Sequence, residues 1–289
     1  MKFPTTSVDE TIANICSEIE QMMGRHGLDS SNTGAIGISC GGPLDSKRGV
    51  VMSPPNLPGW NDIPIVRMLE ERFGIRTGIH NDANACALAE WKFGAGVGTQ
   101  NMVFLTFGTG LGAGLILDGK LYAGTNDNAG ELGHIRLSEF GPVGYGKCGS
   151  FEGFASGGGI AQLARFKVSE KQQMGESVAW CPPGQLDSIS AHTVGLAAAS
   201  GDPLALEIYR ISATYLGRGL AMVIDLLNPE VIVIGSIYVR NRELMEPFVL
   251  QEIEREALSH ARRVCSVRPA KLGEQIGDYA ALSVAANLI

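Results

Sequence analysis

Four short segments of the chain combine polar side chains with glycine in ways that suit substrate binding. The first is the pair Asn81 and Asp82, between a strand expected over 77–80 and a helix expected over 83–93. Ligands of open α/β sheets sit beyond the carboxyl ends of strands, and a carboxylate there can accept a proton from a substrate hydroxyl. Aspartate just before a helix is also a favoured N-cap. The spacing alone leaves both roles open for Asp82.

The second segment is the glycine-rich stretch 106–114, TFGTGLGAG. Its glycines let the backbone approach a ligand closely and adopt positive φ angles, and successive N–H groups can form an anion-binding nest. Thr106 and Thr109 add hydroxyl donors. A strand and a hairpin are expected after the turn rather than a helix, so the pattern is not a dinucleotide-binding fingerprint. It predicts either a phosphate-binding turn or an ordinary glycine-rich hairpin.

The third and fourth segments hold Glu131, His134 and Glu152 in glycine-rich stretches without apolar periodicity. Carboxylate and imidazole groups provide paired acceptors and donors for vicinal hydroxyls. A surface loop with incidental polar residues would give the same pattern, and a carboxylate near a helix start also suits the helix dipole. A metal site at His134 would need further ligands, because Cys148 is the only thiol nearby in the sequence.

The elements that must position these segments follow a mixed α/β pattern of apolar residues. Strands are expected over 34–39, 77–80, 101–107, 113–117 and 231–234, and helices over 7–24, 65–73, 83–93, 158–167, 205–227, 245–257 and 278–288. Ser7 is the expected N-cap of the first helix, and residues 123–150 and 169–189 are expected to be irregular. The glycine-rich stretch 94–102 joins two parts of the chain that differ in their pattern of expected strands and helices. This change indicates a hinge between two lobes, and a cleft between lobes is the usual place for a ligand.

The composition limits the classes of protein that fit. The chain has 289 residues, of which 45% are hydrophobic and 18% charged, so it can bury a large core in two domains of ordinary size. Its formal net charge of −7 argues against a nucleic-acid-binding surface. No apolar stretch is long enough to span a membrane. The six scattered cysteines, without a signal-type N-terminus, predict reduced thiols in a cytoplasmic protein.

The order of the motifs is more specific than any one of them. From about residue 34 to the C-terminus the chain resembles the ROK family of bacterial sugar kinases and related repressors. The segments that carry the resemblance are GISCGGPLD, NLPGW, NDANACALAE, LTFGTGLGAGLI, GELGH, FEGFASG and NPEVIVIG. It implies an actin-like, hexokinase-type α/β fold of two lobes, usually dimeric. It also implies phosphorylation of a hexose or N-acetylhexosamine by ATP with Mg²⁺, usually at the 6-hydroxyl.

The resemblance also implies lobe boundaries and roles for individual residues. The small lobe would cover 1–100, the large lobe 101–274, and a C-terminal helix over 275–289 would return to the small lobe. Asp82 matches the catalytic base and also lines the sugar site. Residues that match the other sugar-contacting positions are Gly41, Gly42, Asn56, Leu57, Asn81, Glu131, His134 and Glu152. Residues that match the phosphate and adenosine positions are Thr106, Gly108, Thr109, Gly110, Gly235 and Ser236.

The sequence departs from the family pattern in two places. Ser150, Tyr145 and Val143 stand where the family has zinc-binding cysteines, so we expect no metal site there and a loop held by packing of Phe140 and Tyr145. The family's first strand carries an Asp-x-Gly-Gly-Thr motif that this sequence does not contain. We therefore expect a small lobe that is incomplete at its N-terminal side, with a sheet edge that a partner subunit covers.

Three functions are compatible with this resemblance. The first is an active sugar kinase. The second is a sugar-binding protein with weak or no catalysis, because the first phosphate motif is missing. A sugar-responsive repressor ranks last, since the family's repressors carry a DNA-binding domain ahead of the kinase-like part and this chain is acidic. The sequence does not select among glucose, fructose, N-acetylglucosamine, N-acetylmannosamine and allose.

Overall fold

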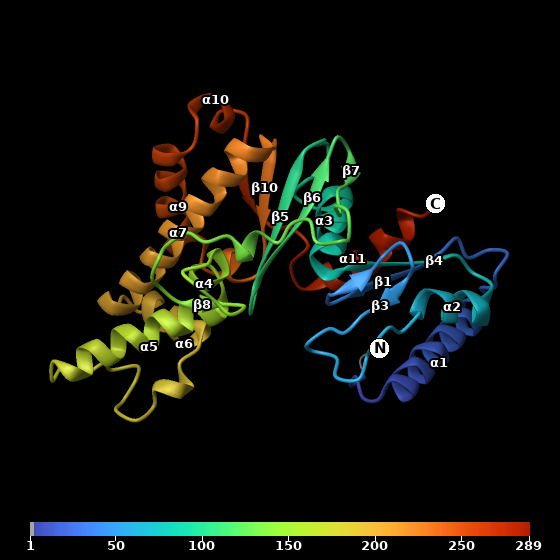
Figure 1. The fold of residues 1–289 in the computed structure, drawn as a ribbon, viewed down its shortest axis with the longest axis horizontal. Helices are drawn as coiled ribbons and strands as arrows, with labels where there is room; N and C mark the ends of the chain where they lie inside the picture. Colours follow the sequence, from blue (N-terminus) through green and yellow to red (C-terminus); the bar gives the residue numbers. More distant parts are fainter. Residues whose placement is uncertain (1–2) are drawn as a thin grey trace.

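The computed structural model describes residues 3–289 and has two lobes (Figure 1). The larger lobe is built on a five-stranded sheet with the strand order β11-β10-β5-β6-β7. Its strands are β5 (Met102–Phe107), β6 (Leu111–Leu117), β7 (Lys120–Leu121), β10 (Val231–Ile234) and β11 (Ser266–Pro269). β10 runs parallel to both β5 and β11, whereas β5, β6 and β7 form an antiparallel meander. β10 is buried along its whole length, as expected for a strand covered on both faces.

Helices of the C-terminal half pack against this sheet and against one another. They are α4 (Phe151–Phe154), α5 (Gly157–Gln173), α6 (Ala191–Ala199), α7 (Pro203–Leu227), α8 (Ile237–Arg240), α9 (Arg242–Glu256) and α10 (Ser259–Arg262). α7 is the central helix, packed on α4, α5, α6 and α9. Its N-cap Asp202 accepts a hydrogen bond from the N–H of Ala205, and left-handed Asn228 ends it, so local signals define both ends.

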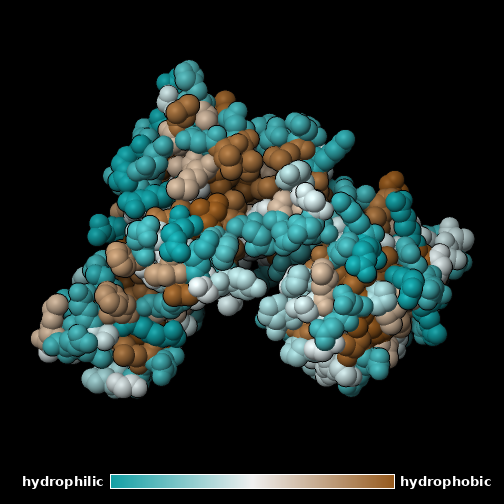
Figure 2. All heavy atoms as spheres, viewed as in Figure 1, coloured by the Kyte–Doolittle hydropathy of each residue, from teal (hydrophilic) through white to brown (hydrophobic). Residues whose placement is uncertain are grey.

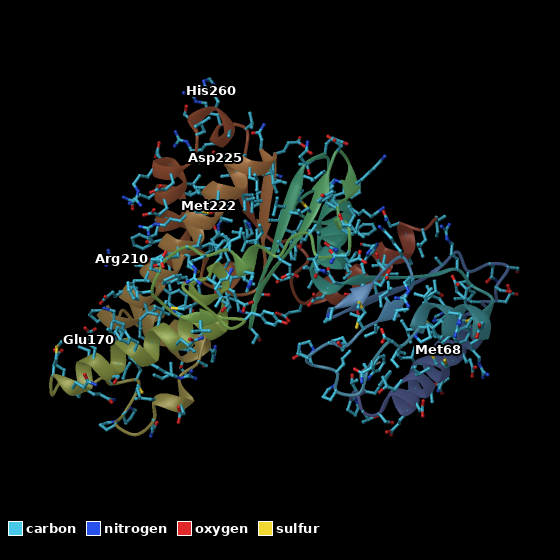
Figure 3. All side chains as sticks on the ribbon, in the orientation of Figure 1. Met68, Glu170, Arg210, Met222, Asp225 and His260 are labelled. Atoms are coloured by element: carbon cyan, nitrogen blue, oxygen red, sulfur yellow. The ribbon has the colours of Figure 1, made fainter. Side chains whose placement is uncertain are left out.

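Two contacts of α7 show how its inner and outer faces differ. On the inner side, Tyr215 stacks on Phe154 with ring centroids 3.5 Å apart. On the outer side, Met222 and Asp225 are exposed to solvent (Figure 3). Asp225 accepts a hydrogen bond of 2.9 Å from the N–H of Leu258. This bond ties the link between α9 and α10 to the long helix.

The smaller lobe has a two-stranded parallel sheet and its own apolar cluster. Its elements are α1 (Val8–His26), β1 (Ile36–Cys40), β2 (Leu44–Asp45), β3 (Val50–Val51), α2 (Ile65–Phe73) and β4 (Thr77–Asn81). β1 pairs with β4, with Ile36 opposite Thr77, and among residues 3–289 its other edge pairs with no strand. Residues of α1 and α2 pack with Trp60 and Ile79 in the cluster.

Two helices lie between the sheets, α3 (Asp82–Phe93) and α11 (Ile276–Ala286). α3 packs on β5 and β6 of the large sheet and on α11, and α11 also packs on β1 (Figure 1). Two glycines make the close approach possible. A Cβ at Gly37 would overlap the backbone of α11, and one at Gly114 would lie 2.6 Å from the carbonyl oxygen of Ala83. These contacts set where the first turn of α3 lies relative to both sheets.

The structure confirms the predicted α/β actin-like fold class and differs from the expected elements in detail. α5 continues to Gln173, into a segment expected to be irregular, and α6 and β11 were not expected at all. α6 is alanine-rich without clear amphipathicity, and its start is marked only by the capping box of Ser190 and Thr193. Over 3–289 no helix is both long and apolar enough to cross a membrane. The lobe boundaries proposed from the sequence stay a prediction.

Candidate active site

A pocket of about 580 Å³ lies between the lobes and collects most of the predicted sugar-contacting side chains. We call it the interlobe pocket. Gly42 and the start of α3 line one side, and the large lobe lines the other with Glu131, His134 and Glu152. The concave surface between the lobes is visible in the space-filling view (Figure 2). Residues distant in the sequence are therefore brought to one cavity of the size that small ligands require.

The helix cap at this pocket is Asn81, not Asp82. The Asn81 side chain accepts a hydrogen bond of 2.7 Å from the N–H of Asn84, the bond that an N-cap makes. Asp82 is the first residue of α3, and its Oδ1 accepts a 2.9 Å bond from the N–H of Ala83. Its side chain is exposed to the pocket. Of the two roles that the sequence left open for Asp82, the cap belongs to its neighbour.

On the opposite wall, Glu131 directly precedes the short turn η1 (Leu132–His134), and His134 is its last residue. Burial raises the pKa of the Glu131 carboxyl above its usual 4.5, the Glu152 carboxylate raises it further, and His134 opposes the shift. The ring of Tyr145 meets that of His134 edge-on, with centroids 6.3 Å apart. This wall of the pocket therefore holds two carboxylates, an imidazole and an aromatic ring.

Glu152 connects this wall to the glycine-rich turn. Its Oε2 accepts a 3.0 Å hydrogen bond from the N–H of Leu111, and a Cβ at Gly110 would lie 2.7 Å from the same oxygen. Ser150 caps α4 through the N–H of Gly153 and thereby orients this stretch. Glu152 is thus a positioning group for the turn as well as a wall of the pocket.

The raised pKa of Glu131 gives a pH prediction for sugar binding. The ionised carboxylate accepts hydroxyl hydrogen bonds, so affinity should fall as pH drops through the raised pKa, starting at a higher pH than for an ordinary glutamate. The same shift makes the folded chain bind this proton more tightly than the unfolded chain. The stability contribution of Glu131 should therefore increase over the interval in which affinity falls.

The measurement is the dissociation constant of the sugar from pH 4 to 7, in the absence of nucleotide, for the wild type and for Glu131→Gln. We expect weaker binding by the variant at neutral pH, about tenfold for a lost charged acceptor, and a flatter profile. An unchanged acid limb in Glu131→Gln would assign the titration to another group.

The glycine-rich turn between β5 and β6 adjoins a second cavity of about 910 Å³, which we call the turn pocket. Gly108 and Thr109 line it, and their carbonyl oxygens accept hydrogen bonds of 2.8 and 3.2 Å from the N–H groups of Gly157 and Gly158, at the start of α5. The hydroxyl of Thr106 instead bonds within the turn, accepting from the N–H of Gly112 at 2.9 Å. The turn is therefore anchored on a helix N-terminus.

The far wall of the turn pocket comes from elements that sequence reasoning did not assign to a site. They include His192 and Gly195 of α6, Arg240 at the end of α8, and Asn241 directly after it. The predicted adenosine positions Gly235 and Ser236 do not line this pocket, although Ile237, the next residue, does. Gly235 is buried and Ser236 has a φ of 51°. The unexpected helix α6 is the reason that this wall was missed.

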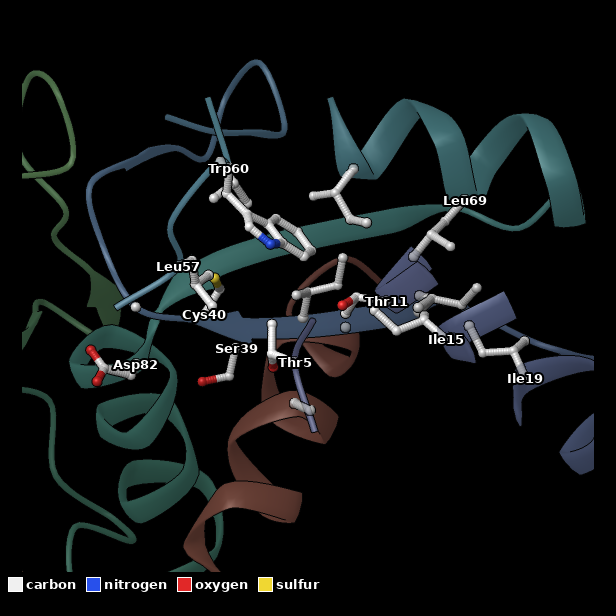
Figure 4. Close-up of a pocket in the computed structure, with 18 of the residues that line it drawn as sticks. Thr5, Thr11, Ile15, Ile19, Ser39, Cys40, Leu57, Trp60, Leu69 and Asp82 are labelled. Carbon is white, nitrogen blue, oxygen red and sulfur yellow. The ribbon is translucent and has the colours of Figure 1, made fainter. Parts of the chain in front are cut away.

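A third cavity, of about 950 Å³, runs along the unpaired edge of β1 and is called the edge cavity here (Figure 4). It is lined by Ser39 and Cys40 of β1, by Ile15 and Ile19 of α1, and by Trp60. Asp82 lies at one end of it (Figure 4). The predicted sugar-contacting residues Gly41, Asn56 and Leu57 face this cavity, not the interlobe pocket, whereas Gly42 and Asp82 line both. Asp82 therefore stands at the junction of the two cavities.

The loop that lacks the zinc cysteines is held differently from what we expected. Phe140 and Tyr145 are 83% and 79% exposed, so their packing does not hold it. Instead the side-chain amide of Gln162 makes two hydrogen bonds with the backbone of Val143. It accepts from the Val143 N–H at 3.0 Å and donates to the Val143 carbonyl at 2.8 Å. No group of three or more potential metal ligands occurs within 3–289. The expectation of a zinc-free loop stays a prediction.

Fold and cavities together define a two-lobed, actin-like α/β protein with a ligand pocket between the lobes and a glycine-rich turn beside it. The ROK family model matches residues 1–287, and the chain belongs to this family. The chain is 32% identical over 287 residues to a glucokinase of Streptomyces coelicolor, covering 98% of this chain and 89% of that one.

Two further relatives bear on function. A structure of a ROK family glucokinase from Streptomyces griseus, in complex with glucose and AMPPNP, aligns with a TM-score of 0.74 and 31% identity, covering 100% of this chain and 90% of that one. The DNA-binding transcriptional repressor Mlc of Escherichia coli is 29% identical over 262 residues, covering 90% of this chain and 63% of the repressor. Relatives of the chain therefore include both enzymes and a regulator.

Proposed function

We propose that this protein is a hexose kinase that transfers the γ-phosphoryl group of ATP to the 6-hydroxyl of a sugar, with glucose as the first substrate to test. The observation that carries the proposal is the position of Asp82. Its carboxylate is exposed at the junction of the interlobe pocket and the edge cavity, and the N-cap of α3 is Asn81 instead. The preference for glucose comes from the glucokinase relatives.

In the proposed reaction Asp82 accepts the proton of the attacking hydroxyl as the phosphoryl group is transferred. Glu131, His134 and Glu152 hold ring hydroxyls on the opposite wall, which fixes the sugar for attack. Phosphoryl transfer depends mainly on positioning and charge neutralisation. Mg²⁺ brought in with ATP supplies much of the neutralisation when bound, and Asp82 is the carboxylate at this junction that would face it.

The turn pocket is the proposed nucleotide site. Its volume of about 910 Å³ is in the range of cofactor pockets. The glycine-rich turn, through Gly108 and Thr109, lies at one end of the cavity and would hold the phosphates. Arg240 and Asn241 offer polar groups at the other end. We therefore expect the phosphates to lie between the nucleoside and the sugar pocket.

Gly158→Leu tests the nucleotide site without touching the sugar site. A Cβ at Gly158 would make only ordinary contacts with Thr109 and Ser156, so the larger side chain fits the fold and projects into the turn pocket. We expect the KM for ATP to rise at least tenfold, about 1.4 kcal/mol, with sugar affinity unchanged. Gly277→Leu, at the exposed second position of α11, is the matched control. Equal effects of both variants on ATP would refute the placement.

The proposal as a whole is tested by ADP release with a panel of glucose, fructose, N-acetylglucosamine, N-acetylmannosamine and allose. Turnover above background with at least one of these sugars is the expected result. Sugar-dependent thermal stabilisation without turnover would exclude a kinase and leave the sugar-binding protein as the function. The same experiment therefore separates the first two functions.

The relation to the repressor Mlc keeps a regulatory function as the second candidate. In that case the interlobe pocket would still bind a sugar, but the response would be conformational, and DNA binding would need other basic surfaces than this acidic chain has.

A homodimer and a cytoplasmic location are further proposals. Leu226 and Leu258, 76% and 67% exposed near the contact of α7 with α10, are apolar side chains that a dimer could cover, and a purely monomeric elution at micromolar concentration would refute it.

A further inference from the structure

Asp127 has a left-handed backbone at the rim of the interlobe pocket, as does Tyr145 with a φ of 44°. Asp127 lies in the segment 123–131, between β7 and η1, and has a φ of 62°. This left-handed region is unfavourable for residues with a side chain and ordinary for glycine. Strain of this kind persists where the surrounding structure enforces it, and it concentrates at functional sites. The side chain of Asp127 shows what enforces it here.

Both carboxylate oxygens of Asp127 bind one residue of the small lobe. Oδ2 accepts a 2.7 Å hydrogen bond from the N–H of Ser46, and Oδ1 accepts a 2.8 Å bond from its hydroxyl. Ser46 lies in the turn between β2 and β3, 81 residues earlier in the chain. Both residues are partly buried, and a two-point bond to a carboxylate is among the stronger hydrogen-bond arrangements. We call this contact the Ser46–Asp127 latch.

The latch lies directly beside the groups that the proposed reaction uses. Asp127 and the following Asn128 line the interlobe pocket, and Glu131 is four residues further along the same segment. The charge of Asp127 also reaches His80, at the end of β4 two residues before Asp82, where it opposes the lowering of the His80 pKa by burial. The latch thus joins the segment that carries Glu131 to the lobe that carries β4.

We propose that Asp127 is a positioning residue for sugar phosphorylation: together with Ser46 it holds the segment 123–131 against the small lobe, so that Glu131 faces Asp82 across the pocket. This inference rests on the proposed kinase function. We assign Asp127 its role through the latch and not through a direct sugar contact, since each of its oxygens already accepts a bond from Ser46. Nor is it there to form the turn, because glycine would form a left-handed turn with less strain.

Asp127→Gly separates positioning from stability, because it removes the latch and relieves the backbone strain together. We expect the dissociation constant for the sugar to rise about tenfold, equivalent to about 1.4 kcal/mol, with no change in the KM for ATP. Asp127→Asn keeps one acceptor oxygen and should restore part of the affinity. Ser46→Ala removes the hydroxyl bond and keeps the backbone bond, so its effect should be about threefold.

The matched control is Asp118→Gly. Asp118 also has a left-handed backbone, with a φ of 51°, but it is exposed in the turn between β6 and β7. The Asp118→Gly variant relieves strain of the same kind without removing the latch. The dissociation constant of the sugar and the KM for ATP should therefore stay at the wild-type values. Equal sugar constants for the wild type and Asp127→Gly would overturn the proposal. A parallel loss of sugar and ATP affinity in Asp127→Gly would also overturn it, because that result indicates general damage.

Hydrogen exchange without any ligand tests the latch independently of the proposed function. In Asp127→Gly the amides of 123–131 should exchange about tenfold faster, whereas Asp118→Gly should leave them unchanged. Unchanged exchange in Asp127→Gly would mean that the latch holds nothing, whatever the chain binds. If the wild type binds none of the hexoses, the proposed function fails, and the exchange rates still decide whether Ser46 and Asp127 hold the segment.

Discussion

Asp82→Asn should abolish turnover and leave sugar binding almost intact. Asparagine is nearly the same size and keeps an oxygen that can accept the N–H of Ala83, so the start of α3 is preserved. It cannot accept the hydroxyl proton, and loss of a general base typically costs about 10²- to 10⁴-fold in rate. The measurements are kcat by ADP release and the dissociation constant of the sugar by calorimetry.

Asn81→Ala is the contrasting variant for this experiment. It removes the cap that bonds the N–H of Asn84 at 2.7 Å, which should cost about 1 kcal/mol of stability and lower the rate indirectly. If Asp82→Asn kept the wild-type kcat while Asn81→Ala lost it, the base would have to be reassigned. A fall in sugar affinity with kcat unchanged would mean that Asp82 serves binding alone.

Glu90→Ala should be among the most destabilising single changes in the chain. Glu90 is fully buried at the end of α3. One carboxylate oxygen accepts 2.9 Å bonds from the N–H groups of Lys271 and Leu272, and the other accepts a 2.7 Å bond from that of Ala95. The segments around 95 and 271 are the two chain connections that lead to β5 and to α11. Glu90 therefore joins both of them to α3.

The alanine variant leaves three backbone donors without their acceptor, and each unsatisfied buried donor costs about 1–3 kcal/mol. We expect the free energy of unfolding to fall by about 4 kcal/mol for Glu90→Ala and by about 2 kcal/mol for Glu90→Gln, which keeps one acceptor oxygen. The measurement is urea unfolding followed by circular dichroism. Glutamine keeps the test informative if the alanine variant does not fold.

The control for this prediction is Glu71→Ala on α2. The Glu71 side chain is 71% exposed and pairs with Arg67 at 3.6 Å on the helix surface, a contact that contributes little to stability. Its loss should change the free energy of unfolding by less than about 0.5 kcal/mol. A Glu90→Ala variant as stable as Glu71→Ala would show that the three bonds are readily replaced by water.

Local chemistry in the sequence determined a large part of this protein. Gly74 ends α2 where the pattern predicted, and the apolar run 231–234 forms a strand with the predicted bounds. Ser7 caps the first helix through the N–H of Glu10, as expected. These features depend on residues within a few positions of one another, so their signals are present in the linear sequence. Family resemblance added the lobed fold and six of the residues that line the interlobe pocket, among them Asp82, Glu131 and Glu152.

Tertiary structure alone decided which of two adjacent residues caps α3, since Asn81 and Asp82 both have the chemistry for it. It also divided the predicted sugar-contacting residues between two cavities, and it put α6 beside the glycine-rich turn. The bonds of Glu90 to Lys271 and of Ser46 to Asp127 span 181 and 81 residues. Such contacts depend on where whole elements pack, and no local pattern encodes them, because the partners meet only when both lobes are folded.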